Sequence, residues 1–304
     1  MPVKSNQTEP FIININKPAD ISSYDVIRRW KPRLKKFGKV GHFGTLDPFA
    51  DGVLMLGVAG AQRLNDYIHR YLPKTYLAKG VLGLETDTGD PTGKVLQRDQ
   101  GQYLEEVIGK FSAAFIQEKL QSEFLGEYFQ SPHPFSAAKF KGKPLHQWAR
   151  EGVVIKKEKV ARQVYLLEVV KYEFPYLWIR FTVSSGTYIR TLFSDCAQSL
   201  GTIGSLKSLT RESVGGCSLG SSISYDSEDI KPLSVEEVLP FGRLELDKER
   251  GKLFSNGVRL RLEQTLSRME GELRGLYWVY ENNRLLGLTE IVDQNLVSKI
   301  NYHI

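Results

Sequence analysis

Residues 39–52 read KVGHFGTLDPFADG, a segment with neither helical nor strand periodicity that combines glycines with a histidine and an acid. Gly41 and Gly44 permit backbone conformations and close approaches that other residues resist. Pro48 restricts Asp47 to an extended conformation, because the proline ring clashes with a helical residue before it. The segment therefore holds one carboxylate on a stiff loop suited to chemistry or contact. A simple turn is the alternative, since Asp-Pro and Asp-Gly are common turn dipeptides.

The segment before this loop is predicted to be a strand followed by a basic helix. Residues 11–15 form a short apolar run, and Ser22 with Asp25 three residues later has the capping-box pattern that begins a helix. One side of this helix is apolar, and the other leads into a run of cations without one acid: Arg28, Arg29, Lys31, Arg33, Lys35, Lys36 and Lys39. This run suits a phosphate backbone, and a solvated helix face explains it equally well.

The segment after the loop is predicted to be a buried strand, a helix and a second strand. Residues 53–59 are continuously apolar, and residues 61–71 repeat apolar side chains at helical spacing, which makes Tyr67 and Tyr71 core residues. Tyr76 opens the next strand, where a side chain can face a cleft. Position alone favours packing for this tyrosine, because aromatic residues at strand starts are mostly core residues.

Two acids in the turn-rich loop of residues 85–93, Asp87 and Asp90, are potential metal ligands by residue type. Carboxylates among threonines and glycines are common turn chemistry, however, and no Walker-type phosphate loop lies near them in the sequence. Cys196 and Cys217 cannot form a four-ligand zinc site by themselves, and no histidine cluster completes one. We therefore expect no metal, and two thiols in a reducing compartment.

The middle of the chain is predicted to contain a helix at residues 102–115 and a lysine-rich passage at residues 130–145. In that passage cations alternate with an aromatic residue and a glycine from Lys139 onward, a pattern that suits a nucleic-acid strand. Residues 164–171 and 177–183 follow as strands, the second with clean alternation of apolar and polar side chains.

A further helix is predicted at residues 187–200, between a Ser-Ser-Gly break and Gly201. Arg190 lies in its first turn, where a cation opposes the helix dipole at a cost of roughly a few tenths of a kcal/mol. A nearby anion would remove this cost.

The composition is that of an ordinary globular protein, and 304 residues suffice for two domains. Forty-one basic and 35 acidic side chains give a modest net charge of +6, so clusters of charge matter more than the total. No signal pattern is present and no apolar run approaches the roughly 20 residues of a membrane span, so we expect a cytoplasmic protein. Short glycine-spaced apolar segments from residue 241 predict a small β-rich barrel, giving domains at residues 1–240 and 241–304.

Residues 41–54 closely resemble the G-H-T-G-T-L-D-P-x-A-x-G-x-L motif of TruB-type tRNA pseudouridine synthases. Leu206, Leu209 and Arg211 resemble that family's L-x-x-L-R-R segment. The family's other signatures are matched in its order by Asn16-Lys17-Pro18 with Ile21-Ser22-Ser23, Lys74-Thr75-Tyr76, Glu85-Thr86-Asp87-Thr88-Gly89-Asp90, Ser136-Ala137-Ala138-Lys139 and Ser185-Gly186-Thr187-Tyr188-Ile189-Arg190-Thr191. The resemblance covers nearly the whole chain.

This resemblance implies an α+β pseudouridine synthase fold, with a mixed and largely antiparallel sheet flanked by helices, followed by a small PUA-like RNA-binding β-barrel. It implies Asp47 as the nucleophile, Tyr76 as an active-site aromatic that handles protons, and Arg190 as the partner of the aspartate. It also implies that a histidine of the glycine loop fills the gap left in the RNA by a flipped uridine. Substrate contacts are accordingly expected for His42, Tyr188, Leu209 and Lys139.

The implied reaction is the isomerisation of a T-loop uridine of tRNA, at position 55, to pseudouridine. The reaction detaches the uracil and rejoins it through C5 without adding atoms, so no cofactor is expected. Flipping the uridine out of the RNA stack costs a few kcal/mol. The expected partner is the T stem-loop of tRNA, and we expect a monomer with no obligatory protein partner and no membrane association.

Three departures from the family pattern are Phe43 for threonine, His146 for tyrosine and Thr210 for arginine. The sequence does not decide whether Phe43 stacks on the substrate or alters the loop, or whether Asp47 attacks C1′, attacks C6 or promotes a glycal route. Two rival classes stay open. One is a non-catalytic RNA-binding or RNA-folding protein, in which Asp47 would be dispensable. The other is the archaeal and eukaryotic type of synthase that depends on guide RNA, against which the lack of long basic tails argues.

Overall fold

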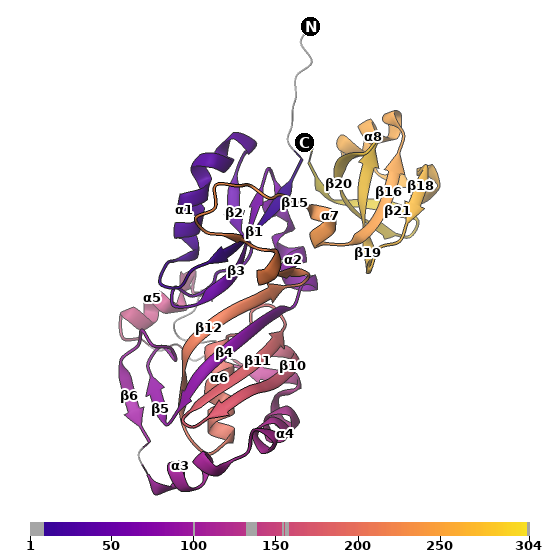
Figure 1. Ribbon diagram of the computed structural model, residues 1–304. Coiled ribbons are helices and arrows are strands. Elements are labelled where there is room, and N and C mark those ends of the chain that lie inside the picture. The colour runs from indigo at the N-terminus through magenta and orange to yellow at the C-terminus, as the bar shows by residue number, and fades with distance from the viewer. Residues whose placement is uncertain (1–8, 100, 132–138, 154, 156–157, 303–304) are drawn as a thin grey trace.

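The computed structural model describes residues 9–99, 101–131, 139–153, 155 and 158–302 (Figure 1). The helices are α1 (Ser23–Leu34), α2 (Asn65–Tyr71), α3 (Gln102–Glu106), α4 (Ala113–Phe124), α5 (Leu145–Arg150), α6 (Ile189–Ser199), α7 (Val235–Val238) and α8 (Lys248–Ser255). The strands of the main sheet are β1 (Phe11–Lys17), β2 (Val40–His42), β3 (Asp51–Val58), β4 (Lys74–Leu82), β7 (Gly126–Gln130), β10 (Val160–Glu173), β11 (Tyr176–Val183), β12 (Gly204–Val214), β13 (Cys217–Ser218), β14 (Ile223–Ser224) and β15 (Leu233–Ser234). Two small hairpins are β5 (Leu84–Thr86) with β6 (Val95–Arg98), and β8 (Lys139–Phe140) with β9 (Lys143–Pro144).

The main sheet is mixed and largely antiparallel, which confirms the predicted fold class. Its strand order is β14-β1-β3-β12-β4-β11-β10-β7, and the pairs β1 with β14 and β3 with β12 are parallel. The parallel pairing of β3 with β12 joins the N-terminal part of the sheet to the rest. It sets Arg211 opposite Gly52 and so brings β12 beside the end of the loop that carries Asp47.

Gly52 is required at this junction. Its φ of +108° is disfavoured for residues with a side chain, and a Cβ atom there would lie 2.3 Å from the carbonyl oxygen of Arg211. The backbone of β12 therefore approaches Gly52 at a distance that no other residue would permit.

Helix α1 and strand β3 form as the sequence predicts. The side chain of Ser22 accepts a hydrogen bond from the backbone of Asp25, whose carboxylate accepts one in return, and this capping box begins the helix. Val26, Trp30 and Leu34, spaced four residues apart, are fully buried against one face of β1 and β3. Strand β3 is buried on both faces, because α2 and the C-terminal sheet cover the other one.

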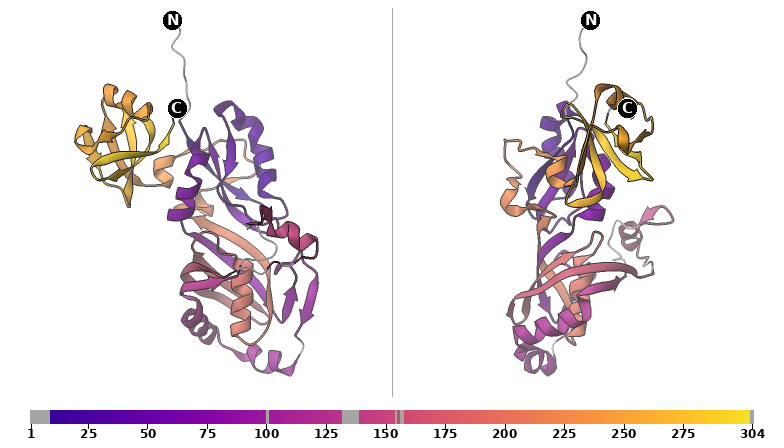
Figure 2. Two further views of the ribbon diagram at one scale, coloured as in Figure 1. Left: turned by 180° about the vertical axis from the view of Figure 1, so that it is seen from behind. Right: turned by 90° about the vertical axis from the view of Figure 1, so that its right-hand side faces the viewer.

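Helices α4 and α6 cover one face of the part of the sheet formed by β4, β10, β11 and β12. The left view of Figure 2 shows α6 in front of this face. The single helix predicted at residues 102–115 is wrong. The structure has α3, a 3-10 turn and then α4, because Ser112 accepts a hydrogen bond from the backbone N–H of Phe115 and starts a new helix.

The C-terminal part forms a separate six-stranded curled sheet, consistent with a PUA-like domain (Figures 1 and 2). Its strands are β16 (Phe241–Leu246), β17 (Leu260–Arg261), β18 (Ser267–Met269), β19 (Leu273–Glu281), β20 (Arg284–Val292) and β21 (Asn295–Asn301). Phe241 meets the half-buried rings of Tyr67 and Tyr71 edge to face, so the two sheets share an apolar contact. We propose residue 241 as the start of the second domain. Among the described residues, no helix is long and apolar enough to cross a membrane.

Candidate active site

A cavity of about 950 Å³ lies where the loop that carries Asp47, β4, β12 and the start of α6 meet. It brings together every predicted site residue whose side chain the structure describes: His42, Asp47, Tyr76, Tyr188, Arg190 and Leu209. The remaining predictions fall outside this set. The side chains of Lys139 and His146 lie outside the described part of the chain, as do residues 136–138 of the lysine motif.

The loop that carries Asp47 is fixed from below by two buried polar residues. Ser23, at the start of α1, donates its hydroxyl proton to the carbonyl of Leu46 and accepts the N–H of the same residue, at 3.1 and 2.9 Å. The ammonium of Lys17 donates to three carbonyls, including that of Pro48 at 3.2 Å. These bonds satisfy backbone groups that the irregular loop cannot pair within itself, so the loop is held rigidly.

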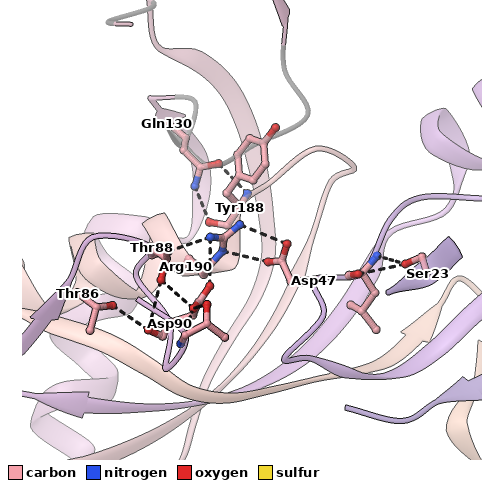
Figure 3. A network of polar contacts seen from close by, with 10 residues as sticks. Ser23, Asp47, Thr86, Thr88, Asp90, Gln130, Tyr188 and Arg190 are labelled. Atoms are coloured by element: carbon pink, nitrogen blue, oxygen red, sulfur yellow. Dashed lines mark hydrogen bonds and ion pairs between the residues drawn. The ribbon is translucent and has the colours of Figure 1, made fainter. Parts of the chain in front are cut away.

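Arg190 holds the carboxylate of Asp47 with two nitrogens (Figure 3). Its Nε lies 3.0 Å from Oδ2 and its Nη2 lies 3.3 Å from Oδ1, the fork geometry in which a guanidinium binds a carboxylate. The arginine side chain is 6% exposed, whereas that of Asp47 is 35% exposed and borders the cavity. The pairing expected from the sequence is therefore present, and it leaves the carboxylate accessible to a ligand.

Asp90 is a site residue whose role the sequence did not reveal. Its Oδ2 lies 3.3 Å from Nη1 of Arg190, so this buried arginine bridges two carboxylates. Its Oδ1 accepts hydrogen bonds from the hydroxyls of Thr88 and Thr92 and from the backbone of Thr92. The carbonyl of Thr88 accepts a further bond from Arg190 at 2.8 Å. The turn of residues 86–92 thus orients the guanidinium of Arg190. Asp90, a potential metal ligand by residue type, forms an ion pair with this guanidinium. Within the described residues, no group of three His, Cys, Asp or Glu side chains could hold a metal.

Burial and charge act on Asp47 in opposite directions. Burial in the cavity wall raises the pKa of this carboxyl, because desolvation penalises its charged form. The Arg190 guanidinium lowers the pKa, in the sense expected from the sequence, without cancelling the shift. The carboxylate is therefore more basic than that of an exposed aspartate.

The other predicted residues line the cavity from three directions. Tyr76 lies on β4, buried beside β11 and β12. Tyr188 precedes α6, and its backbone N–H and carbonyl are both bonded to the side chain of Gln130, at 2.8 and 2.9 Å. Gln130 is a second residue that sequence reasoning missed. His42 lies on β2, and burial together with Arg211 lowers its pKa, which favours a neutral ring.

The structure shows where two of the departures from the family pattern lie. Phe43 is 1% exposed and packs in the core, where the absence of a side chain at Gly57 makes room for its ring. The aromatic ring therefore does not stack on a ligand in the cavity. Thr210 is half-buried beside Leu209 on β12, pointing to the opposite face of the sheet.

The basic run of residues 28–39 is partly neutralised. Arg29 and Arg33 approach the carboxylate of Glu228 at 3.5 and 3.4 Å. Glu228 lies about two hundred positions later in the sequence, in a connection that the fold lays along α1. The exposed lysines of this run form the part that is available to a phosphate backbone: Lys31, Lys35, Lys36 and Lys39.

Comparisons with known proteins show the family of this chain. Residues 31–189 match the family model of the TruB family pseudouridylate synthase N-terminal domain. The chain is 34% identical over 287 residues to tRNA pseudouridine synthase B of Clostridium tetani, and 36% identical over 284 residues to the protein of the same name from Clostridium kluyveri. Each match covers 91% of this chain and 94% of the relative.

The fold is also that of a solved structure. A chain in the crystal structure of a Cbf5-Nop10-Gar1 complex superimposes with a TM-score of 0.68 and 20% identity, over 96% of this chain and 83% of that one. The protein described here belongs to the TruB family of pseudouridylate synthases. It is accordingly an isomerase that converts uridine in RNA to pseudouridine.

Proposed function

We propose that the chain isomerises uridine 55 in the T-loop of tRNA, with Asp47 as the nucleophile and without a cofactor. The observation that carries this proposal is the position of Asp47, held in a fork by buried Arg190 and facing the cavity. The relatives that match 91% of the chain are named tRNA pseudouridine synthases, which supports tRNA as the substrate.

The residues around Asp47 supply the remaining needs of the reaction. Arg190 orients the carboxylate and favours its charged form. Tyr76, buried in the wall of the same cavity, handles the proton at the carbon that is rejoined. His42 replaces the flipped base in the RNA stack, and Leu209 packs on the detached uracil. Tyr188 and Lys139 contact the substrate.

We propose that the enzyme acts alone, as a monomer, on tRNA in the cytoplasm. The exposed lysines at and after the end of α1 directly precede the glycine loop in the sequence and can bind the phosphate backbone. The likeness to a chain of a Cbf5-Nop10-Gar1 complex concerns the fold and does not argue for a guide RNA. Activity on bare tRNA with no other component would support this part of the proposal.

The test replaces Asp47 by asparagine, which keeps the shape of the side chain and removes its charge. We expect the variant to fold, to bind tRNA nearly as the wild type does, and to release no tritium from uridine labelled at C5. Asp66→Asn, at an exposed position of α2, is the matched control and should retain full release. Full release by Asp47→Asn would remove this residue from the mechanism and favour another nucleophile.

A further inference from the structure

A second polar cluster borders the same cavity through His69 and Lys74 and has no part in the proposed chemistry. The ammonium of Lys74, on β4, lies 2.7 Å from the hydroxyl of Ser185 and 3.2 Å from Nδ1 of His69. Nδ1 of His69 and the hydroxyl of Ser185 are themselves 3.3 Å apart. Lys74 is only 5% exposed, and it forms no ion pair with any carboxylate of the described residues.

The surroundings of Lys74 add positive charge. Arg211, on β12, is 1% exposed, and its guanidinium donates to the carbonyls of Val53 at 2.7 Å and Gly44 at 3.3 Å. Its charge further disfavours a protonated Lys74. A buried cation without an opposite charge is costly, and proteins usually pair such groups. The cluster therefore has the composition of an anion site: a cation, a hydroxyl and an imidazole converging on one point beside a second cation.

Resting on the proposed function, we propose that Lys74, His69 and Ser185 bind a backbone phosphate that flanks the target uridine. The substrate of this enzyme carries a phosphate on each side of every nucleotide. A charge-assisted hydrogen bond from a desolvated ammonium and a neutral one from a hydroxyl are the contacts that proteins use for such phosphates.

The distance from Asp47 fits one nucleotide. A Cβ atom at Gly44 would lie 3.3 Å from Cε1 of His69 and 3.7 Å from Nζ of Lys74, so the loop backbone touches the cluster. Asp47 follows three residues later, and three residues span at most about 10 Å. The side chains of Lys74 and Asp47 line the same cavity. A nucleotide whose sugar lies against Asp47 can thus place an adjoining phosphate at Lys74.

Protonation provides an independent signature of this site. Burial, reinforced by Arg211, lowers the pKa of Lys74 to about 7, and a bound phosphate would raise it again. The groups that face Lys74 are His69 from α2, Ser185 from the loop after β11 and Arg211 from β12. Burial and Lys74 lower the pKa of His69, so at pH 8 this histidine is neutral in the free enzyme. Binding RNA at pH 8 is then accompanied by proton uptake at Lys74.

The test measures whether Lys74 and one phosphate act on each other. Stem-loop RNAs carry a methylphosphonate in place of the phosphate on the 5′ or the 3′ side of the target uridine. Each methylphosphonate RNA is compared with an RNA that has a normal phosphodiester at the same linkage. In both RNAs the nucleotide on the 5′ side of this linkage has a 2′-deoxy sugar. Dissociation constants are measured for Asp47→Asn and for the same protein with Lys74→Met. Lys79→Met is the control, because Lys79 lies on the opposite face of β4, over the rings of Tyr176 and Trp178.

We expect the methylphosphonate at one of the two linkages to weaken RNA binding by the Asp47→Asn protein, in which Lys74 is intact, roughly tenfold. In the protein that also carries Lys74→Met, the methylphosphonate should not weaken binding further. The slope of log K against log salt should fall in magnitude by about one, the value for the loss of one phosphate contact. The Asp47→Asn protein with Lys79→Met should respond to the methylphosphonate as Asp47→Asn alone does. Equal losses with and without Lys74 at both linkages would overturn the proposal.

Two further points keep the test decisive. If Lys74→Met does not fold, calorimetry at pH 8 in two buffers of different ionisation enthalpy measures proton uptake by Asp47→Asn with Lys74 intact. Less uptake with one methylphosphonate RNA supports the site, and equal uptake with all RNAs refutes it. These are binding measurements, so they do not depend on Asp47 being the nucleophile. Failure of the proposed function would show in tritium release by the wild type, which is measured separately.

Discussion

Replacing Arg190 by methionine is expected to destabilise the protein and to change the pH dependence of the reaction. The arginine side chain is 6% exposed, and it bridges Asp47 and the nearly buried Asp90. Methionine leaves both carboxylates without this cation. Removing one partner of a buried ion pair costs about 3–5 kcal/mol, which is a large part of the 5–15 kcal/mol by which a typical domain is stable.

The effect on the reaction follows from the pKa of Asp47. Burial raises that pKa and Arg190 opposes the rise, so the methionine variant has a still higher pKa. A nucleophilic carboxylate must be ionised, so kcat falls as the pH is lowered through this pKa. In the wild type we expect the fall above the value of about 4 of an exposed aspartate. In Arg190→Met the fall in kcat should occur at higher pH. Arg190→Lys keeps the charge and loses the two-nitrogen contact, so its fall should lie between those of the wild type and Arg190→Met.

Arg180 provides the matched control. This arginine also bridges two carboxylates, Glu168 at 2.7 Å and Glu212 at 2.8 Å, and its side chain is 32% exposed on the sheet surface. Exposed pairs contribute about 0–1 kcal/mol each, so Arg180→Met should lower the free energy of unfolding much less and leave the pH profile of kcat unchanged. Urea denaturation and tritium release over a range of pH measure both quantities. Equal destabilisation by the two variants, with the same pH profile, would refute the assignment of Arg190.

Two other predictions concern the RNA surface and the strand junction. Lys35→Glu with Lys36→Glu should weaken tRNA binding and reduce its salt dependence with little change in Tm, because both lysines are exposed. Arg29→Gln should have a smaller effect, because Arg29 is already paired with Glu228. Equal binding by all variants would place the RNA elsewhere. Gly52→Ala should cost about 1–3 kcal/mol from its backbone conformation alone. Its contact with Arg211 adds to this, so Gly257→Ala, with φ of +76° in open space, should be less destabilising in urea, and the reverse order would contradict the close approach of β12.

The local features of this protein were determined by the sequence. The capping box of Ser22 and Asp25, the buried strand β3 and the first-turn position of Arg190 in α6 were all predicted from residues within a few positions of each other. Such features depend on hydrogen bonds and side-chain spacing along one segment, which the sequence displays directly. The pairing of Arg190 with Asp47 was predicted because the resemblance to the family supplied it, and no spacing rule could have done so.

Other features were decided by the tertiary structure. The bond between Asp90 and Arg190 joins residues 100 positions apart, and the neutralisation of Arg29 by Glu228 joins residues 199 positions apart. Both depend on strand order and register, the second on the parallel pairing of β1 with β14, which ends four residues before Glu228. A sequence pattern shows which face of an element is apolar and leaves open which distant element covers it. For that reason the sequence singled out the loop that carries Asp47, whereas only the folded chain placed the second carboxylate, Gln130 and the Lys74 cluster around it.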